Sequence, residues 1–327
     1  MSSINTNASA MTALQTLSAT NKALSTTQNR IATGFRVAEA SDNAAYWSIA
    51  TTMRSDTKAL GTVKDALGLG AAKVDTAYTG VNAAIDVVNE IKSKLVAARE
   101  PGVDRTKIQA EITQLQSQLS SNASAVTFSG ENWLSVNSTA TGYNATKSIV
   151  ASFTRASDGS VSVGTISINT SGMKLFDSTA DLATGGGTVG GGGTGILDAV
   201  RSATTGARLA DQTAAGFTVA NLSISALTNS TADQTTLESY IKGVDSAIQE
   251  MTTAASDLGS AKKRIDIQST FVTNLMDTID RGVGQLVDAD MNKESTRLQA
   301  LQVQQQLGIQ ALSIANSNTQ SILSLFR

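Results

Sequence analysis

Residues 53–95 read MRSDTKALGTVKDALGLGAAKVDTAYTGVNAAIDVVNEIKSKL, and every seventh position of this stretch is apolar. The residues at these positions are Met53, Leu60, Leu67, Val74, Val81, Val88 and Leu95. A second, partly filled stripe of Ala71, Tyr78 and Ile85 widens the apolar face. A period near 3.5 over this length predicts a long helix that packs against other helices. Ser41 or Asp42 can cap its start.

A second heptad series lies near the other end of the chain. Its members are Leu237, Val244, Met251, Leu258, Ile265, Val272, Ile279 and Leu286. Its companion stripe is interrupted by Lys262 and Ser269. Thr235 and Glu238 predict a capping box where the series begins. Both ends of the chain therefore predict long, core-facing helices.

A shorter helix follows the first long one. Pro101 and Gly102 interrupt the first helix, and Asp104 is placed to cap the next. The new apolar stripe consists of Ile108, Ile112, Leu115, Leu119 and Val126. Because the connection is short, the two helices are predicted to form an antiparallel hairpin.

The outermost segments carry weaker stripes. These are Ala10, Leu17, Leu24 and Ile31, with Gly34 as a left-handed helix end, and then Leu298, Leu301, Leu312, Ala315 and Ile322. No Asp or Glu precedes Glu39 or follows Glu294, and polar residues that are mediocre helix formers crowd both ends. Burial of so few apolar side chains returns less free energy than ordering the backbone costs. We expect each terminus to be unfolded alone and helical when bound.

The middle of the chain, residues 142–229, changes to strand and turn patterns. The apolar residues that alternate with polar neighbours are Ile149, Ala151, Phe153, Val161, Val163, Ile166 and Ile168. Asp158 and Gly159 predict a turn, and a phase slip near Gly164 predicts a bulge. Residues 184–195 hold eight glycines in twelve and predict a flexible exposed loop. Because no GxxxxGK followed by Ser or Thr occurs, this loop is not predicted to bind phosphate.

The composition excludes several classes of function. The 327 residues include no Cys and no His, so thiolate or imidazole metal sites, Cys/His or Ser/His/Asp nucleophiles and disulfides are excluded. The 25 basic and 27 acidic residues give no footprint for nucleic acid or an anionic membrane, and we expect protein partners. No run of about 18 apolar residues predicts membrane insertion. The first 30 residues lack the apolar core of a cleaved secretion signal, so we expect export without one.

These patterns together predict a mainly α fold. Both chain ends form a long antiparallel helical bundle or coiled coil, and the middle forms a small β-containing insert domain. We expect no cofactor, no metal and no catalytic residue, because no pair of carboxylates facing a cleft is discernible. The chain is therefore interpreted as an assembly subunit and not as an enzyme.

Several strings within this architecture resemble bacterial flagellin. They are INTN at residues 4–7, RIATGFRV at 30–37, SDNAA at 41–45, IQAEI at 108–112, TFSG at 127–130, DADM at 288–291 and SILSL at 321–325. The resemblance covers residues 1–135 and 235–327. Tyr46 and Trp47 form a bulky pair where many flagellins carry small residues, and this pair is similar to the rhizobium-like alphaproteobacterial type.

The resemblance implies a subunit of the extracellular flagellar filament. Terminal helices at 1–40 and 288–327 would form the inner filament core. Residues 41–140 and 232–287 would form a helical outer-core domain, and 141–231 a variable, surface-exposed domain with β hairpins and the glycine-rich loop. The implied partners are the chain itself in a helical homopolymer, other flagellins, an export chaperone, the type III export apparatus, and the hook-filament junction and cap proteins.

The assembly interface is predicted on the terminal helices and the bulky pair. Its residues are Leu14, Leu17, Leu24, Ile31, Tyr46, Trp47, Leu298, Leu301, Leu312, Ile322 and Leu325. The Arg-Glu-Leu segment that an innate receptor reads in many flagellins has no counterpart, since residues 88–98 contain no Arg. Receptor activation is therefore not expected of this chain.

Other interpretations stay open from the residues alone. The heptads also fit a monomeric helical core, a coiled-coil adhesin or a surface-layer protein, and the strings also fit a hook-filament junction protein less well. The bulky pair could form a ligand platform instead of a packing contact. The cluster of Asp288, Asp290, Lys293 and Glu294 could bind a divalent cation, but we interpret it as a solvated charged joint between two helices.

Overall fold

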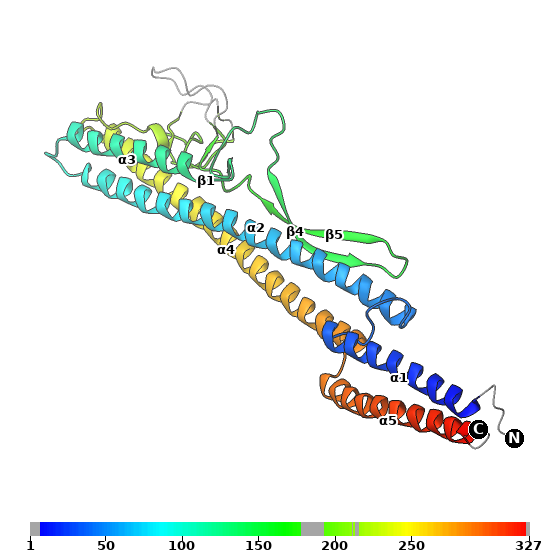
Figure 1. Cartoon of the computed structure of the whole chain (residues 1–327). Coiled ribbons are helices and arrows are strands. Elements are labelled where there is room, and N and C mark those ends of the chain that lie inside the picture. Colours follow the sequence, from blue (N-terminus) through cyan, green and yellow to red (C-terminus); the bar gives the residue numbers. More distant parts are fainter. Residues whose placement is uncertain (1–6, 178–192, 211, 213–215, 325–327) are drawn as a thin grey trace. The chain divides into compact units, whose positions relative to one another are not determined.

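The computed structural model describes residues 7–177, 193–210, 212 and 216–324, with their side chains except those of 318–324. It confirms the mainly α class (Figure 1). The chain divides into two compact units, one formed by Met1–Ala59 with Asn274–Arg327 and the other by Leu60–Thr273. Both ends of the chain therefore belong to one unit, and the middle of the chain to the other.

The order of elements separates helical ends from a β-containing middle. The helices are α1 (Ala8–Thr33), α2 (Ala44–Ala97), α3 (Arg105–Ala125), α4 (Thr231–Val287), α5 (Met291–Ser324) and a short 3-10 turn η1 (Val219–Asn221). The strands are β1 (Thr127–Phe128), β2 (Glu131–Asn132), β3 (Ser135–Val136), β4 (Thr146–Arg155), β5 (Val161–Asn169) and β6 (Phe176–Asp177).

In the second unit, α2 pairs antiparallel with α4. Lys92 meets Asp245 at 2.5 Å and Asp75 meets Lys262 at 2.5 Å, an order that only antiparallel helices can produce. The predicted heptad residues form the buried seam between them: Leu67, Val74, Val81, Val88 and Leu95 of α2 with Leu237, Val244, Met251, Leu258 and Ile265 of α4. The heptad prediction is confirmed here, and Lys262, which breaks the companion stripe, reaches an acid on the partner helix.

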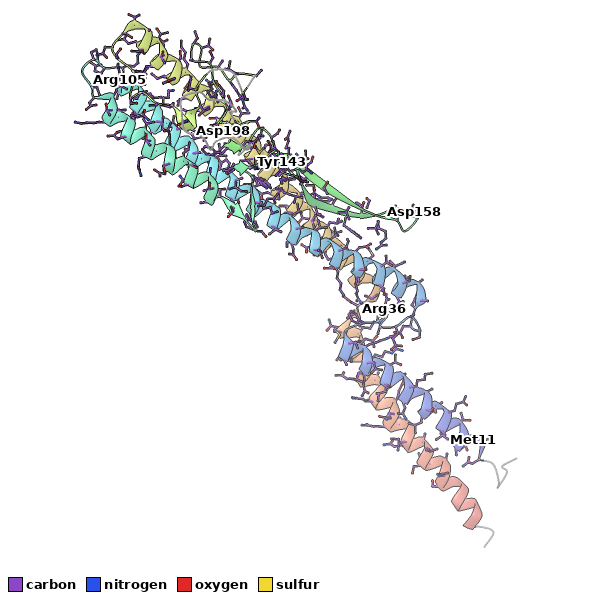
Figure 2. The ribbon with its side chains drawn as sticks, turned by 90° about the horizontal axis from the view of Figure 1, so that it is seen from above. Met11, Arg36, Arg105, Tyr143, Asp158 and Asp198 are labelled. Carbon is purple, nitrogen blue, oxygen red and sulfur yellow. The ribbon has the colours of Figure 1, made fainter. Side chains whose placement is uncertain are left out.

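The turn into α3 is held by a buried cation. Asp104 accepts the backbone N–H groups of the first turn of α3, which confirms it as the cap. Arg105 is buried and donates to the carbonyls of Ala98 and Leu227 and to the side chain of Asn229. The side chain, labelled in Figure 2, thus joins the ends of α2 and α3 to the chain entering α4.

Two predicted helix caps are wrong. The start of α2 is capped by Asn43, whose side chain accepts the N–H groups of Ala45 and Tyr46. Asp42 instead accepts N–H groups of the preceding loop, so it closes that turn. The predicted capping box of Thr235 and Glu238 is also wrong, because α4 begins one turn earlier.

Ser230 is the residue that caps α4. Its hydroxyl accepts the N–H of Asp233, and the Asp233 carboxylate accepts the N–H of Thr228. Thr235 lies inside the helix, where its hydroxyl donates to the carbonyl of Thr231. The Ser-x-x-Asp sequence therefore makes a capping arrangement that begins at Ser230, seven residues before Leu237, where the heptad series starts.

The β4–β5 hairpin confirms the predicted turn at residues 158–159 and has a bulge, which lies opposite Gly164 on β4 and not at Gly164 itself. Gly159 has φ of 86° in the turn, a conformation that favours glycine. The register advances by two residues on β4, from Val150 to Ser152, against one on β5, so Ala151 is the extra residue. Ile149 of β4 packs onto Gly70 of α2, where a Cβ would lie 2.5 Å from its Cγ2 atom.

Two smaller sheets complete the insert. β1 pairs antiparallel with β2, and β3 pairs parallel with β6. Most of the glycine-rich loop predicted at residues 184–195 lies outside the described residues. Its last glycines, Gly193 and Gly195, are described and are buried against Asp198, where a side chain on either glycine would overlap the carboxylate.

Glycine at position 70 is predicted to be required for seating the hairpin on α2. We expect Gly70→Leu to lower the free energy of unfolding by about 1–3 kcal/mol through overpacking against Ile149. Gly68→Leu is the matched control, because nothing lies within 4 Å of its Cβ position, and it should raise stability by up to about 1 kcal/mol through helix propensity. Equal effects in urea unfolding would contradict the packing argument.

Candidate assembly surface

α1 and α5 lie side by side and antiparallel within the first unit (Figure 1). The side-chain hydrogen bonds that join them run in antiparallel order: Asn7 to Ala315, Asn21 to Gln305 and Arg30 to Glu294. Asn7 also caps α1, and Gly34 ends it with φ of 75°, as the sequence predicts. The first and last described helices therefore form one terminal hairpin.

Most predicted interface residues lie along the inner side of this terminal hairpin. Leu301 is buried, and Leu17, Leu24, Ile31, Leu298 and Leu312 are half-buried. Gly308 of α5 lets Leu17 approach closely, since a Cβ there would lie 3.2 Å from the Leu17 Cδ1 atom. These side chains therefore bring α1 and α5 of one subunit together. The side chain of Ile322 and all of Leu325 lie outside the described residues.

A different set of apolar side chains points outward. Leu14 belongs to it, together with residues that the sequence reasoning missed: Met11, Val303, Leu307, Ile309 and Ile314. Ile314 and Met11 are 67% and 65% exposed. The sequence does contain a pattern that predicts this outer face: the apolar residues Val303, Leu307 and Ile314 form a second stripe with spacings of four and seven residues. A helix that is apolar on several faces is usually buried on all of them. Because α1 covers only one face of α5, the other apolar faces of α5 are left for another partner.

The bulky pair lies on the first turn of α2, and its side chains point away from a small core. That core consists of Val37, Ala50, Val283 and Val287. Tyr46 and Trp47 are exposed, as is Ile49 next to them. The chain itself therefore leaves this aromatic surface uncovered.

The junction between α4 and α5 is a helix break, as predicted, at residues 288–290. Backbone hydrogen bonds join it to the end of α1: Arg36 and Val37 donate to the carbonyl of Val287, and Ala289 donates to that of Gly34. Asp290 caps α5. The prediction that the charged cluster is solvated is wrong for Glu294. This residue is buried, and its Oε1 atom lies 3.4 Å from the Nη1 atom of Arg30.

Comparisons with known proteins match both ends of the chain. The family models described as the bacterial flagellin N-terminal helical region and the bacterial flagellin C-terminal helical region match residues 4–139 and 241–326. The chain belongs to the bacterial flagellin family. This flagellin is 54% identical to Flagellin C of Rhizobium meliloti (strain 1021) over 334 residues and 48% identical to Flagellin A of that strain over 409. It is 45% identical to a flagellin of Brucella melitensis over 328 residues, and all three matches cover 100% of both chains.

Membership of the flagellin family establishes the general function of the chain. This flagellin is a structural subunit of the extracellular flagellar filament and not an enzyme, which confirms the assembly interpretation. Identity over the full length to flagellins of Rhizobium meliloti also confirms the rhizobium-like type. In the described part of the chain, no helix combines the length and apolarity needed to cross a bilayer.

The perturbed carboxyl groups of the insert have structural roles. Burial raises the pKa of Asp198 to about 6, although its Oδ2 atom accepts the N–H of Asp177 at 2.6 Å. Burial also acts to raise the pKa of Asp177, but hydrogen bonds from Lys174, Ser138 and Thr194 outweigh it and hold that pKa at about 2. Figure 2 labels Asp198 in the interior of the second unit.

Asp198 should make the stability of the second unit depend on pH. Its pKa is higher when folded, about 6, than the ordinary 3.8, so the folded state binds more protons between these values. The free energy of unfolding should fall by up to about 3 kcal/mol as pH rises from about 4 to about 6. Asp198→Asn should remove this fall in urea titrations, and the exposed control Asp65→Asn should keep it. An unchanged pH profile in Asp198→Asn would contradict the assignment.

Proposed function

We propose that this flagellin polymerises into the swimming filament through the outer faces of the terminal hairpin and through Tyr46 and Trp47. The observation that carries the proposal is the set of exposed apolar side chains on α1 and α5. Apolar patches of this kind on a soluble subunit mark association surfaces. The occupant that fits a filament subunit is a neighbouring copy of this chain.

The terminal hairpin is proposed to fold stably only on assembly. Among the described side chains of α1 and α5, only Thr27, Glu294 and Leu301 are buried. Few buried contacts and many exposed ones give a low local free energy of opening. Each outward aliphatic side chain that a neighbour covers contributes about 1.5–3 kcal/mol, so several together supply the missing free energy. The helical α1 and α5 are then the conformation of the assembled subunit.

The division of labour along the chain follows from this proposal. Residues 1–40 and 288–327 form the inner filament core, and 41–140 with 232–287 form the outer-core domain. Residues 141–231 form the variable domain on the filament surface. The composition supports this order, because no acid precedes Glu39 or follows Glu294 and the two termini fold weakly.

Export follows the same physical logic. A chain whose termini fold only on assembly can travel unfolded and without a cleaved signal through the type III export apparatus, guided by an export chaperone. At its destination it meets the hook-filament junction and cap proteins and other subunits, including other flagellins. The proposed export route and these partners are supported by the family membership and by the weak terminal folding.

Hydrogen exchange tests the coupled folding. Amides of residues 8–33 and 291–317 should exchange rapidly in dilute monomer and become protected in polymer, because burial by neighbours closes the local opening. The amides of α2 and α4 in the second unit provide the internal control and should be protected in both states. Strong protection of the terminal helices in the monomer would refute the proposal.

Substitutions on the outer face test the interface. Leu307→Ser and Ile314→Ser should each raise the critical concentration for polymerisation by about tenfold or more, because a buried aliphatic contact is lost. The unfolding transition of the second unit should stay unchanged. Gln310→Ser, exposed on the same helix, is the matched control and should polymerise normally. Normal critical concentrations in both leucine and isoleucine variants would exclude this face.

A further inference from the structure

The apolar residues of the β4–β5 hairpin change face along its length, and the bulge at Ala151 brings Phe153 of β4 into register with this change on β5. On the helix side of the bulge, Ile149 pairs with Ile166 and both are buried. Beyond it, Phe153 pairs with Val163. Successive residues of β5 alternate in direction, so Val163 points opposite to Ile166. The outer half of the hairpin therefore carries its apolar side chains on the face turned away from its own helices.

The resulting hairpin patch consists of Phe153, Val161 and Val163, and the Arg155 guanidinium lies 6.0 Å from the centroid of the Phe153 ring. Val161 and Val163 are 49% and 55% exposed. The opposite face of this half is polar, where the Thr154 and Ser162 hydroxyls hydrogen-bond at 2.8 Å. An exposed apolar face above a polar one is the reverse of the arrangement expected for a hairpin that packs only on its own chain.

A second uncovered apolar surface lies on α4 in the same unit. Ile267 and Phe271, one turn apart, are 59% and 56% exposed. Arg264 lies one turn before them, is exposed, and has no ion-pair partner among the described residues. These three residues form the helix patch. The neighbouring Gln268 donates to the carbonyl of Ala151 at the base of the hairpin, so the helix patch flanks the base while the hairpin patch lies toward the tip.

We infer that the hairpin patch of one subunit docks onto the helix patch of a second copy of this chain. The inference rests on the proposed polymerisation. Two different patches that fit each other give a head-to-tail contact, which repeats along an open filament, whereas a self-complementary patch closes a dimer. The chain carries two such unlike patches in one unit, which is what repeated addition of identical subunits requires.

Charge supports the same occupant. Asp158 lies at the exposed hairpin tip (Figure 2), where its Oδ1 atom accepts the N–H of Ser160. An acid beside an aliphatic patch complements the cation beside the Ile267 and Phe271 patch. Asp158 and Arg264 thus set the direction of docking, and the apolar side chains supply the buried surface.

Cysteine pairs test the contact directly, because the chain contains no Cys. Full-length Val163→Cys/Ile267→Cys protein, polymerised and then oxidised, should give a ladder of covalent oligomers on denaturing gels. Each subunit offers both halves of the contact to different neighbours, so the ladder extends beyond dimers. Val161→Cys/Phe271→Cys provides a second pair in case the first disturbs packing.

The controls separate this inference from the proposed function. Val163→Cys/Thr252→Cys should give no ladder, because exposed Thr252 lies about 22 Å along α4 from position 267. Filaments that form without a ladder from either pair overturn the docking inference and leave polymerisation intact. Dimers from Val163→Cys alone overturn it in favour of hairpin-to-hairpin contact. Unmodified chain that fails to form filaments overturns the proposed function itself.

Charge reversal gives an independent readout. Asp158→Arg and Arg264→Asp should each raise the critical concentration about two- to fivefold, as expected for an exposed pair. Their combination should restore the wild-type value, since the pair is then reversed and not broken. A double variant that polymerises no better than the worse single variant overturns the charge assignment.

Discussion

Apolar side chains at every seventh position of α2 and α4 bury one another along an antiparallel seam, and the other elements of the second unit are placed by that contact. The seam brings together residues from the two halves of the chain, such as Lys92 with Asp245. It also fixes where the insert can attach: Ile149 of the hairpin rests on Gly70 of α2, and Gln268 of α4 holds Ala151. A period of seven thus sets the geometry of the β-containing middle as well as of the helices.

The first unit follows a different physical balance. Its terminal hairpin buries little, keeps large apolar side chains such as Ile314 outside, and depends on polar contacts such as Arg30 with Glu294. A subunit that must be monomeric before assembly and tightly packed afterwards needs surfaces whose burial comes from its neighbours. In this flagellin the contacts that drive assembly are therefore proposed to be the same contacts that stabilise the folded terminal helices.

The bulge at Ala151 connects the fold to association in the second unit. One extra residue on β4 moves Phe153 to the face on which its β5 partner Val163 lies. Without the bulge, Ile149 could still pair with Ile166, but Phe153 would not lie opposite Val163 on the same face of the hairpin. A local irregularity of backbone register thereby creates a surface that the chain itself does not cover.

The sequence by itself determined the features that depend on local spacing and local backbone chemistry. These include the heptad helices, the left-handed Gly34, the Asp104 cap, the turn at Gly159 and the bulge, and the quoted strings pointed to the family. Boundaries were less certain: Asn43 and not Asp42 caps α2, because several side chains near a helix start compete for the same N–H groups.

Tertiary structure decided which face of each terminal helix is inner and which is outer. α5 has apolar residues on more than one face, so spacing alone could not tell Leu301 from Leu307, and only the position of α1 separates them. It also decided that Glu294 is buried beside Arg30, 264 residues away. The raised pKa of Asp198 likewise comes from burial by distant segments. Spacing along a helix defines its stripes, but burial is fixed by partners that lie far away in the chain.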